Sequence, residues 1–200
     1  LSTRDRKDII LTCSDDEGKT WQTIGSLARI TGMPAVHEAD KMVERVDGSL
    51  ILPMQRPFHG ASKQHPLFYI RCTDRGQTWS KPVFWATHPG KRYQGLPHGS
   101  FADLRETSLA VLSDTQWLGI FRESRGTPAP EDAKRGPLSM PFLCLARSND
   151  DGRSWKSSFG FLGVEPDIAA LPGGAVMATF RDDNLASVWI SYDGGVSWQI

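Results

Sequence analysis

The strongest constraint on the fold is a short turn motif that recurs four times along the chain. Each copy fits S-x-D-x-G-x-[ST]-W, except that Cys72 replaces the leading Ser in the second copy. A motif that returns at intervals of roughly 40 residues or more indicates a propeller or another array of structural units. Because the spacing varies, we expect a common unit with connections of variable length. The copies are CSDDEGKTW (13–21), CTDRGQTW (72–79), SNDDGRSW (148–155) and SYDGGVSW (191–198).

The residue types of the motif suit a tight turn that closes a β-hairpin. Asp and Ser side chains can accept hydrogen bonds from nearby backbone N–H groups, and Gly can adopt a positive φ. The Trp can fold back as a hydrophobic plug. We therefore interpret the motif as a structural lock rather than a catalytic device. Its spacing also differs from that of an EF-hand calcium loop.

Short apolar runs rich in β-branched and aromatic residues lie between the motifs and predict strands. No helical period extends beyond a couple of turns. Many short strands favour an all-β fold, and the repeat favours a propeller over a sandwich. The predicted strands are DIILTC (8–13), SLILPMQR (49–56), LFYIRC (67–72), SLAVL (108–112), WLGIFR (117–122), PFLCLAR (141–147), AVMATFR (175–181) and ASVWISY (186–192).

Composition excludes several classes of function. The chain has 200 residues, of which 39% are hydrophobic, and 23 basic residues balance 23 acidic ones. A net charge of zero gives no support for binding to nucleic acid or to membrane surfaces. No apolar stretch approaches the roughly 18 residues that a membrane-spanning helix needs. The oligomeric state stays open.

The three cysteines each lie in a predicted strand that leads into a turn motif. Because Cys13, Cys72 and Cys144 are odd in number, we expect buried thiols rather than a disulfide framework. Neither they nor the histidines have metal-ligand spacing, so no metal site is predicted. The sequence also lacks a phosphate-binding loop and a G-x-S-x-G motif. No cofactor is expected.

A second repeat carries more chemical information. The segments 40–56, 106–122 and 165–181 each begin with an acid, end with Arg and have turn residues in register at the middle. Each is therefore predicted to be a β-hairpin whose first and last residues are cross-strand neighbours. The three expected acid–Arg pairs are Asp40–Arg56, Glu106–Arg122 and Glu165–Arg181.

In a propeller these hairpins would form the inner two strands of consecutive blades. The acid–Arg pairs would then lie at one mouth of the central channel, and the tryptophan turns would lie on the opposite face. Converging Arg side chains select an anionic substrate. This makes Arg56, Arg122 and Arg181 candidate substrate-binding residues. In the alternative interpretation, each acid only neutralises its own Arg and joins adjacent strands.

The turn motifs resemble the Asp boxes of the sialidase (neuraminidase) superfamily of BNR-repeat proteins. The resemblance spans essentially the whole chain and implies a six-bladed β-propeller. Its most specific part is EPDIAALPGGAVMATFR (165–181), which is similar to the family segment where a catalytic Glu precedes a hairpin that ends in a substrate-binding Arg. The order of motifs also fits, since three precede this segment and one follows it.

The resemblance implies a retaining exo-glycosidase that releases terminal sialic acid or a related acidic sugar from glycans. In the family, three Arg residues bind the sugar carboxylate, a Tyr polarised by a Glu is the nucleophile, and an Asp is the acid/base. Carried onto this sequence, Glu165 is the candidate base and Arg181 one carboxylate-binding residue. The acid/base is expected at Asp5 or Asp8, although that segment is shorter than the family's loop.

The chain also departs from the family pattern. The Arg expected on the first strand is absent, and the resemblance places the third Arg and the Tyr nucleophile in later blades. None of Tyr69, Tyr93 and Tyr192 is in the expected place. Residues 1–200 are therefore expected to be a fragment with about four of six blades, which end near residues 21, 79, 155 and 198. The alternative function is a non-catalytic propeller that binds a glycan or a protein. The compartment is left open, although a glycan substrate would favour a secreted, periplasmic or surface location.

Overall fold

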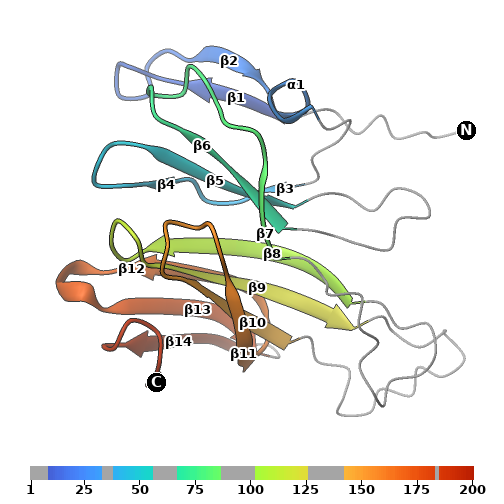
Figure 1. Cartoon of the computed structure of the whole chain (residues 1–200), viewed down its shortest axis with the longest axis vertical. Helices are drawn as coiled ribbons and strands as arrows, with labels where there is room; N and C mark the ends of the chain where they lie inside the picture. The colour runs from blue at the N-terminus through green and yellow to red at the C-terminus, as the bar shows by residue number, and fades with distance from the viewer. Residues whose placement is uncertain (1–8, 33–37, 56–66, 87–101, 126–141, 183–184) are drawn as a thin grey trace, which may run out of the picture.

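The structure is a computed structural model that describes residues 9–32, 38–55, 67–86, 102–125, 142–182 and 185–200. Its strands form four antiparallel sheets, which we call blades 1 to 4 and which follow one another in sequence order (Figure 1). Blade 1 contains β1 (Ile10–Cys13) and β2 (Gln22–Ser26), and it is followed by the short helix α1 (Leu27–Thr31). Blade 2 contains β3 (Glu38–Ala39), β4 (Val43–Glu44), β5 (Leu50–Gln55), β6 (Leu67–Cys72) and β7 (Val83–Ala86).

Blades 3 and 4 have the longer strands. Blade 3 contains β8 (Ala102–Val111), β9 (Trp117–Arg125), β10 (Phe142–Ser148) and β11 (Lys156–Leu162). Blade 4 contains β12 (Val164–Ala170), β13 (Val176–Asp182) and β14 (Leu185–Ser191), with a 3₁₀ turn at Pro172–Gly174 between the first two. Sheets that stack side by side in chain order are the arrangement of a β-propeller, so the prediction of this all-β architecture is confirmed.

The continuous apolar runs in the sequence arise because the sheets are covered on both faces. Successive side chains of a strand point to opposite sides. In β9, Trp117 and Phe121 pack with blade 2, whereas Leu118 and Ile120 pack with blade 4. A strand that is buried on both faces has no solvent-exposed polar face, so its sequence is a continuous apolar run. The core therefore lies between blades rather than inside a single sandwich.

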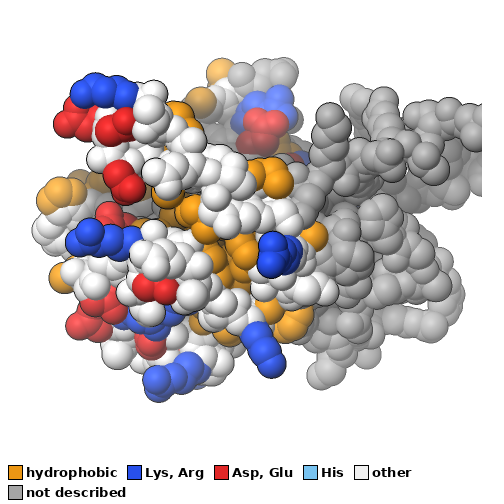
Figure 2. Space-filling model, turned by 90° about the horizontal axis from the view of Figure 1, so that it is seen from above, with side chains coloured by type: hydrophobic (Ala, Val, Ile, Leu, Met, Phe, Trp, Pro, Cys, Tyr) orange, Lys and Arg blue, Asp and Glu red, His pale blue; other side chains and the backbone are white. Residues whose placement is uncertain are grey.

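Three clusters of buried side chains fill the junctions between consecutive blades. Each cluster also includes the Trp of one turn motif: Trp79 between blades 1 and 2, Trp155 between blades 2 and 3, and Trp198 between blades 3 and 4. Trp21, in the first motif, has no described sheet on its outer side and is 65% exposed. Viewed from the side of β1 and β2, hydrophobic side chains remain visible in the surface (Figure 2).

The turn motifs have the internal hydrogen bonds that their residue types predict. In the third copy, Ser148 Oγ donates to Asp150 Oδ1 at 2.8 Å and accepts from the Gly152 N–H at 2.9 Å. The Ser154 N–H donates to Asp150 Oδ1 at 2.8 Å, and Trp155 Nε1 donates to the Gly152 carbonyl at 2.7 Å. The other three copies repeat these bonds. The prediction that the motif is closed by its own side-chain and backbone hydrogen bonds is confirmed.

The second copy makes the same bonds with a thiol. Cys72 Sγ accepts from the Gly76 N–H at 2.8 Å and lies 3.0 Å from Asp74 Oδ1, to which it donates. All three cysteines are free thiols, as expected. Cys72 and Cys144 are buried, whereas Cys13 is only partly buried.

Each of the first three motifs connects the last two strands of its sheet. After each turn the chain adds one further strand, β2, β7 or β11, which pairs with the strand before the turn. The sequence did not predict these strands, because β2 and β11 mix polar residues with glycine and apolar residues, and β7 has only four residues. The sheets therefore extend beyond residues 21, 79 and 155, where the sequence suggested that blades end.

The motif carboxylates predict a specific acid sensitivity. Hydrogen bonds from the Ser154 hydroxyl and backbone N–H, and from Ser148, lower the pKa of Asp150 to about 2. Because the pKa is lower in the folded chain, this carboxylate stabilises the fold above about pH 4, and the contribution disappears as the pH falls to about 2. We expect the wild type to be more stable than Asp150→Asn near neutral pH and the difference to shrink over that interval.

Urea unfolding followed at a series of pH values measures this difference. Asp15→Asn is the matched control, because the Asp15 carboxylate makes no hydrogen bond within the described part of the chain and the charge change is the same. A difference between wild type and Asp150→Asn that stays constant down to about pH 2 would contradict the prediction.

Candidate functional site

Glu106 and Glu165, the acids that begin the second repeat in blades 3 and 4, lie in β-bulges of the inner strands. β8 is irregular between Arg105 and Ser108, and β12 is irregular between Val164 and Asp167. The bulged residues Glu106 and Glu165 have φ values of 50° and 55°. A residue with a side chain pays about 1 kcal/mol or more for this left-handed conformation, which Glu17, Arg75 and Asp151 of the turn motifs also adopt. The bulges thus give both carboxylates a direction that a regular strand would not.

The bulges also correct the predicted register. Arg122 lies opposite Arg105 rather than Glu106, and Arg181 lies opposite Val164 rather than Glu165. The expectation that acid and Arg are directly opposite in the ladder is therefore wrong by one residue. The physical reason is that each inner strand contains two residues that find no partner in the ladder.

The acid–Arg pairs nevertheless form in both blades. Glu106 Oε1 lies 2.7 Å from Arg122 Nη1, and Glu165 Oε1 lies 3.1 Å from Arg181 Nη2. In blade 2, Asp40 lies at the equivalent break between β3 and β4. Its expected partner, Arg56, lies outside the described residues.

The pairs lie at the end of the hairpins that is remote from the turn motifs. β10 begins opposite Glu123, next to Arg122, and ends at Ser148 opposite Trp117, near the hairpin turn. The third motif starts at that end. Blade 4 repeats this geometry, since Ser191 lies opposite Val176. The prediction that acid–Arg pairs and tryptophan turns lie at opposite ends is confirmed, and we call the end with the pairs the mouth.

Glu106 connects blade 3 to blades 2 and 4, and both of its carboxylate oxygens and its backbone N–H have partners. Its Oε2 accepts the backbone N–H of Glu165 at 2.8 Å, while Oε1 binds Arg122. Its own N–H donates to Gln55 Oε1 of blade 2 at 3.0 Å. The Glu106 and Arg122 side chains are only 22% and 17% exposed. For this pair, the interpretation that the acid neutralises its Arg and joins neighbouring strands fits the geometry.

The Glu165–Arg181 pair differs from its equivalent in blade 3. Its side chains are 63% and 50% exposed. Within the described part of the chain, the second oxygen of Glu165 accepts no hydrogen bond. A carboxylate with a free oxygen beside an accessible guanidinium can take part in proton transfer and can bind an anion. Blade 4 is the last described blade, whereas the equivalent oxygen of Glu106 accepts the N–H of the blade that follows it, so the different exposure of the two pairs follows from their positions.

A polar cluster that sequence reasoning missed lies two residues further along the inner strands. Ser108 Oγ donates to Asp167 Oδ1 at 2.6 Å, and Lys41 Nζ lies 2.8 Å from the same oxygen. Partial burial by itself would raise the pKa of Asp167, but the hydrogen bonds from Lys41 and Ser108 outweigh it and hold the pKa below its usual value. The available signal was the alignment of Ser108 with Asp167 in the second repeat.

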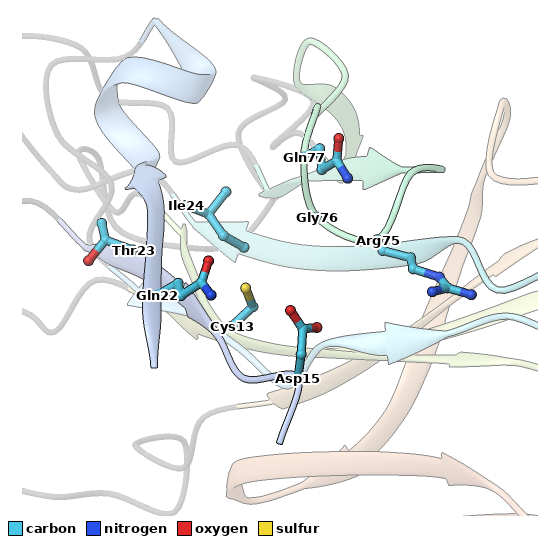
Figure 3. Close-up of a pocket in the computed structure, with 8 residues that line it drawn as sticks. All are labelled: Cys13, Asp15, Gln22, Thr23, Ile24, Arg75, Gly76 and Gln77. Carbon is cyan, nitrogen blue, oxygen red and sulfur yellow. The ribbon is translucent and has the colours of Figure 1, made fainter. Parts of the chain in front are cut away.

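The described residues contain a pocket beside the first two turn motifs, at the end of the sheets remote from the mouth (Figure 3). Cys13, in the lining of this pocket, stands where Arg71 and Arg147 stand in blades 2 and 3. Arg71 Nη1 reaches Asp151 Oδ2 of the next motif at 3.0 Å, and Arg147 Nη1 reaches the Gly194 carbonyl at 2.6 Å. The short Cys13 side chain makes no equivalent contact with the described residues, and the pocket beside it has a volume of about 700 Å³. No predicted site residue lines it; the lining is Cys13, Asp15, Gln22, Thr23, Ile24, Arg75, Gly76 and Gln77.

Several sequence predictions fall on residues that the structure does not describe. These are the acid/base candidates Asp5 and Asp8, together with Arg56. Of the tyrosines, Tyr69 is buried, and burial raises its pKa to about 12. Among the described residues, no cluster of three or more potential metal ligands exists, and no helix in that part has the length and apolar character to cross a bilayer.

Comparison with known proteins shows the fold of the chain. No protein-family model and no curated protein matches the sequence. Among solved structures, a Dyadobacter fermentans protein of unknown function is 18% identical over 96% of this chain, with a TM-score of 0.60. A variant of the NanB sialidase from Streptococcus pneumoniae is 17% identical over 90% of the chain, with a TM-score of 0.59. An α-L-arabinofuranosidase from Fusarium graminearum is 15% identical over 96% of the chain, with a TM-score of 0.60.

The chain corresponds to only part of each of these proteins. It covers 57% of the Dyadobacter protein, 25% of the sialidase and 54% of the arabinofuranosidase. At such low identity the likeness concerns the fold alone. The chain has a sialidase-like β-propeller fold, with four blades in the described residues.

Proposed function

We propose that this chain forms part of a sialidase-like glycoside hydrolase that releases terminal sialic acid, or a related acidic sugar, from glycoconjugates. Glu165 is the proposed base that polarises the nucleophile, and Arg181 the residue that binds the sugar carboxylate. Arg122 and Arg56 would contribute further positive charge at the mouth, and Asp5 or Asp8 would supply the acid/base. The fold that the chain has in common with a sialidase supports the substrate class by analogy only.

The observation that carries the proposal is the ion pair that Glu165 forms with Arg181 at the bulge of β12, at the mouth. Glu106 and Arg122 are largely buried, and both carboxylate oxygens are occupied by the protein. Glu165 and Arg181 occupy the same place in blade 4, which has no further blade beside it in the described part of the chain, so their greater exposure follows from that position. The proposal therefore rests on the Glu165–Arg181 pair and its place at the mouth.

Charge at the mouth suits an anionic sugar. Nε of Arg122 is buried and finds no acceptor within the described residues, so its guanidinium is not saturated by Glu106. Arg181 presents its guanidinium beside an exposed carboxylate. Planar guanidinium groups bind carboxylates through paired N–H donors. A substrate carboxylate could therefore replace part of the contact between Glu165 and Arg181.

Release of a fluorogenic group from an α-sialoside by the full-length protein tests the proposal. We expect Glu165→Gln to lower kcat/KM about a hundredfold, because it removes the base but keeps the shape of the side chain. Arg181→Ala is expected to raise KM about tenfold or more, because carboxylate binding is weakened. Arg153→Ala, an exposed arginine of the third motif at the far end, is the matched control and should leave both constants unchanged.

A second function remains in competition, namely glycan binding without catalysis. The use of Glu106 and Gln55 to join blades favours it, because at least one acid–Arg pair serves the architecture. Wild-type protein that binds a sialylated glycan but releases no sugar would support this alternative. Activity undiminished in both Glu165→Gln and Arg181→Ala would remove these residues from the site.

A further inference from the structure

Lys41 makes an ion pair between two blades that are not neighbours. Lys41 belongs to blade 2, where it lies in the segment between β3 and β4. Its Nζ lies 2.8 Å and 3.0 Å from the two carboxylate oxygens of Asp167 in blade 4. Blade 3 lies between these two blades (Figure 1). Its residue Ser108 donates to Asp167 at 2.6 Å. The Lys41 side chain therefore crosses the inner edge of blade 3, two residues further along the inner strands than the acid–Arg pairs at the mouth.

Asp167 is also the residue at which the bulge of β12 ends. The ladder with β13 resumes there, where Asp167 lies opposite Thr179. The N–H of Ile168 donates to Asp167 Oδ1 at 2.8 Å, and Lys41 Nζ donates to the Ile168 carbonyl at 3.0 Å. These contacts hold the carboxyl-terminal side of the bulge. The amino-terminal side is held by the bond from the Glu165 N–H to Glu106.

Glu165 lies between these two anchors in a conformation that costs energy. With φ at 55°, it persists only because the surrounding contacts determine it. Loss of one anchor lets the bulge relax towards a regular strand, which would turn the carboxylate away from its present direction. Lys41 lies 126 positions before Asp167 in the chain, so this anchor depends on a residue that is distant in sequence.

We propose that Lys41 is a positioning residue for Glu165. Through Asp167 it fixes the bulge of β12, and the bulge sets the direction of the Glu165 carboxylate at the mouth; this rests on the proposed role of Glu165. The ion pair is a poor candidate for general stability, because its side chains are 47% and 51% exposed and exposed ion pairs contribute little. Its effect is expected on geometry rather than on unfolding.

Lys41→Met tests the proposal, because it removes the ammonium group and keeps the length of the side chain. We expect kcat to fall about tenfold while KM changes less than about twofold, because Arg181 still binds substrate and only the base is misplaced. Lys41→Arg restores a cation and should recover most of kcat. Lys156→Met, an exposed lysine of β11 with no partner among the described residues, is the matched control.

Amide NMR provides a measurement that does not require activity. In Lys41→Met, and to a smaller degree in Ser108→Ala, the amide resonances of Glu165 and Ile168 should shift, whereas in Lys156→Met they should not. Unmoved resonances in a folded Lys41→Met protein would overturn the proposal, even if its Tm had dropped. A rise in the KM of Lys41→Met by the same factor as the fall in its kcat would also overturn the proposal. Shifted resonances in a protein that hydrolyses no sialoside would support the positioning contact and count against the proposed function alone.

Discussion

Gly152→Ala is expected to lower the free energy of unfolding by about 3 kcal/mol. Gly152 in the third motif has a φ of 77°, which costs a residue with a side chain about 1 kcal/mol. An added Cβ would also lie 2.6 Å from the Tyr69 hydroxyl and 2.9 Å from Cζ3 of Trp117. Both rings are buried between blades 2 and 3 and cannot move aside without disturbing that core. Overpacking of this kind adds roughly 1–3 kcal/mol.

Gly48→Ala is the matched control for the packing part of this effect. Gly48 has nearly the same φ, 75°, but an added Cβ would meet nothing within 4 Å. We expect it to cost about 1 kcal/mol from the backbone alone. Urea unfolding followed by tryptophan fluorescence gives both values. Equal losses in the two variants would show that close approach of the motif to the preceding blade is not what requires glycine.

Arg45→Ala should destabilise the chain by about 2–3 kcal/mol. The Arg45 side chain is 5% exposed, and its guanidinium lies 3.1 Å from Asp151 Oδ1 and 3.2 Å from Asp47 Oδ2. Nη2 also donates to the Asp114 carbonyl at 2.9 Å, and the group stacks on Trp117 at 5.7 Å from the ring centroid. Removal of this cation takes one partner from Asp47, Asp151 and the Asp114 carbonyl, although Arg71 still pairs with both carboxylates at 3.4 Å and 3.0 Å. The expected loss therefore comes from these contacts and from the packing of a buried side chain on Trp117, not from a buried charge left without a partner.

A double-mutant cycle separates the ion pair from lost packing. Arg45→Ala and Asp151→Ala together should cost less than the sum of the single changes, with a coupling energy of about 1–3 kcal/mol. Arg153→Ala, which changes an exposed arginine in the same motif, should stay within about 0.5 kcal/mol of the wild type. Additive losses in the cycle would mean that Arg45 acts through its contact with Trp117 and not through Asp151.

Much of the fold could be predicted because its signals are local. The turn motif is closed by bonds between residues at most four positions apart, so eight residues suffice to recognise it. The apolar runs of β9 and β10 reflect burial on both faces and predict strands without any knowledge of the neighbours. The opposite placement of acid–Arg pairs and motifs followed from hairpin geometry.

The candidate site was predictable only in outline. The Glu106–Arg122 and Glu165–Arg181 pairs could be read from the repeat, but the bulges that shift their register could not. No residue type in these segments signals a left-handed glutamate. The different exposure of the two equivalent pairs was equally hidden, because it depends on which neighbouring blade supplies a partner.

By itself, the sequence determined the repeat, the all-β class and the residues at the ends of each hairpin, since these depend on contacts within a few residues or one hairpin. The tertiary structure alone decided that Glu106 joins the blades on either side of it. It also brought Lys41 to Asp167 across blade 3 and placed a pocket beside Cys13, where blades 2 and 3 have an arginine. Contacts between separate blades depend on how the sheets stack, and no short stretch of sequence encodes that stacking.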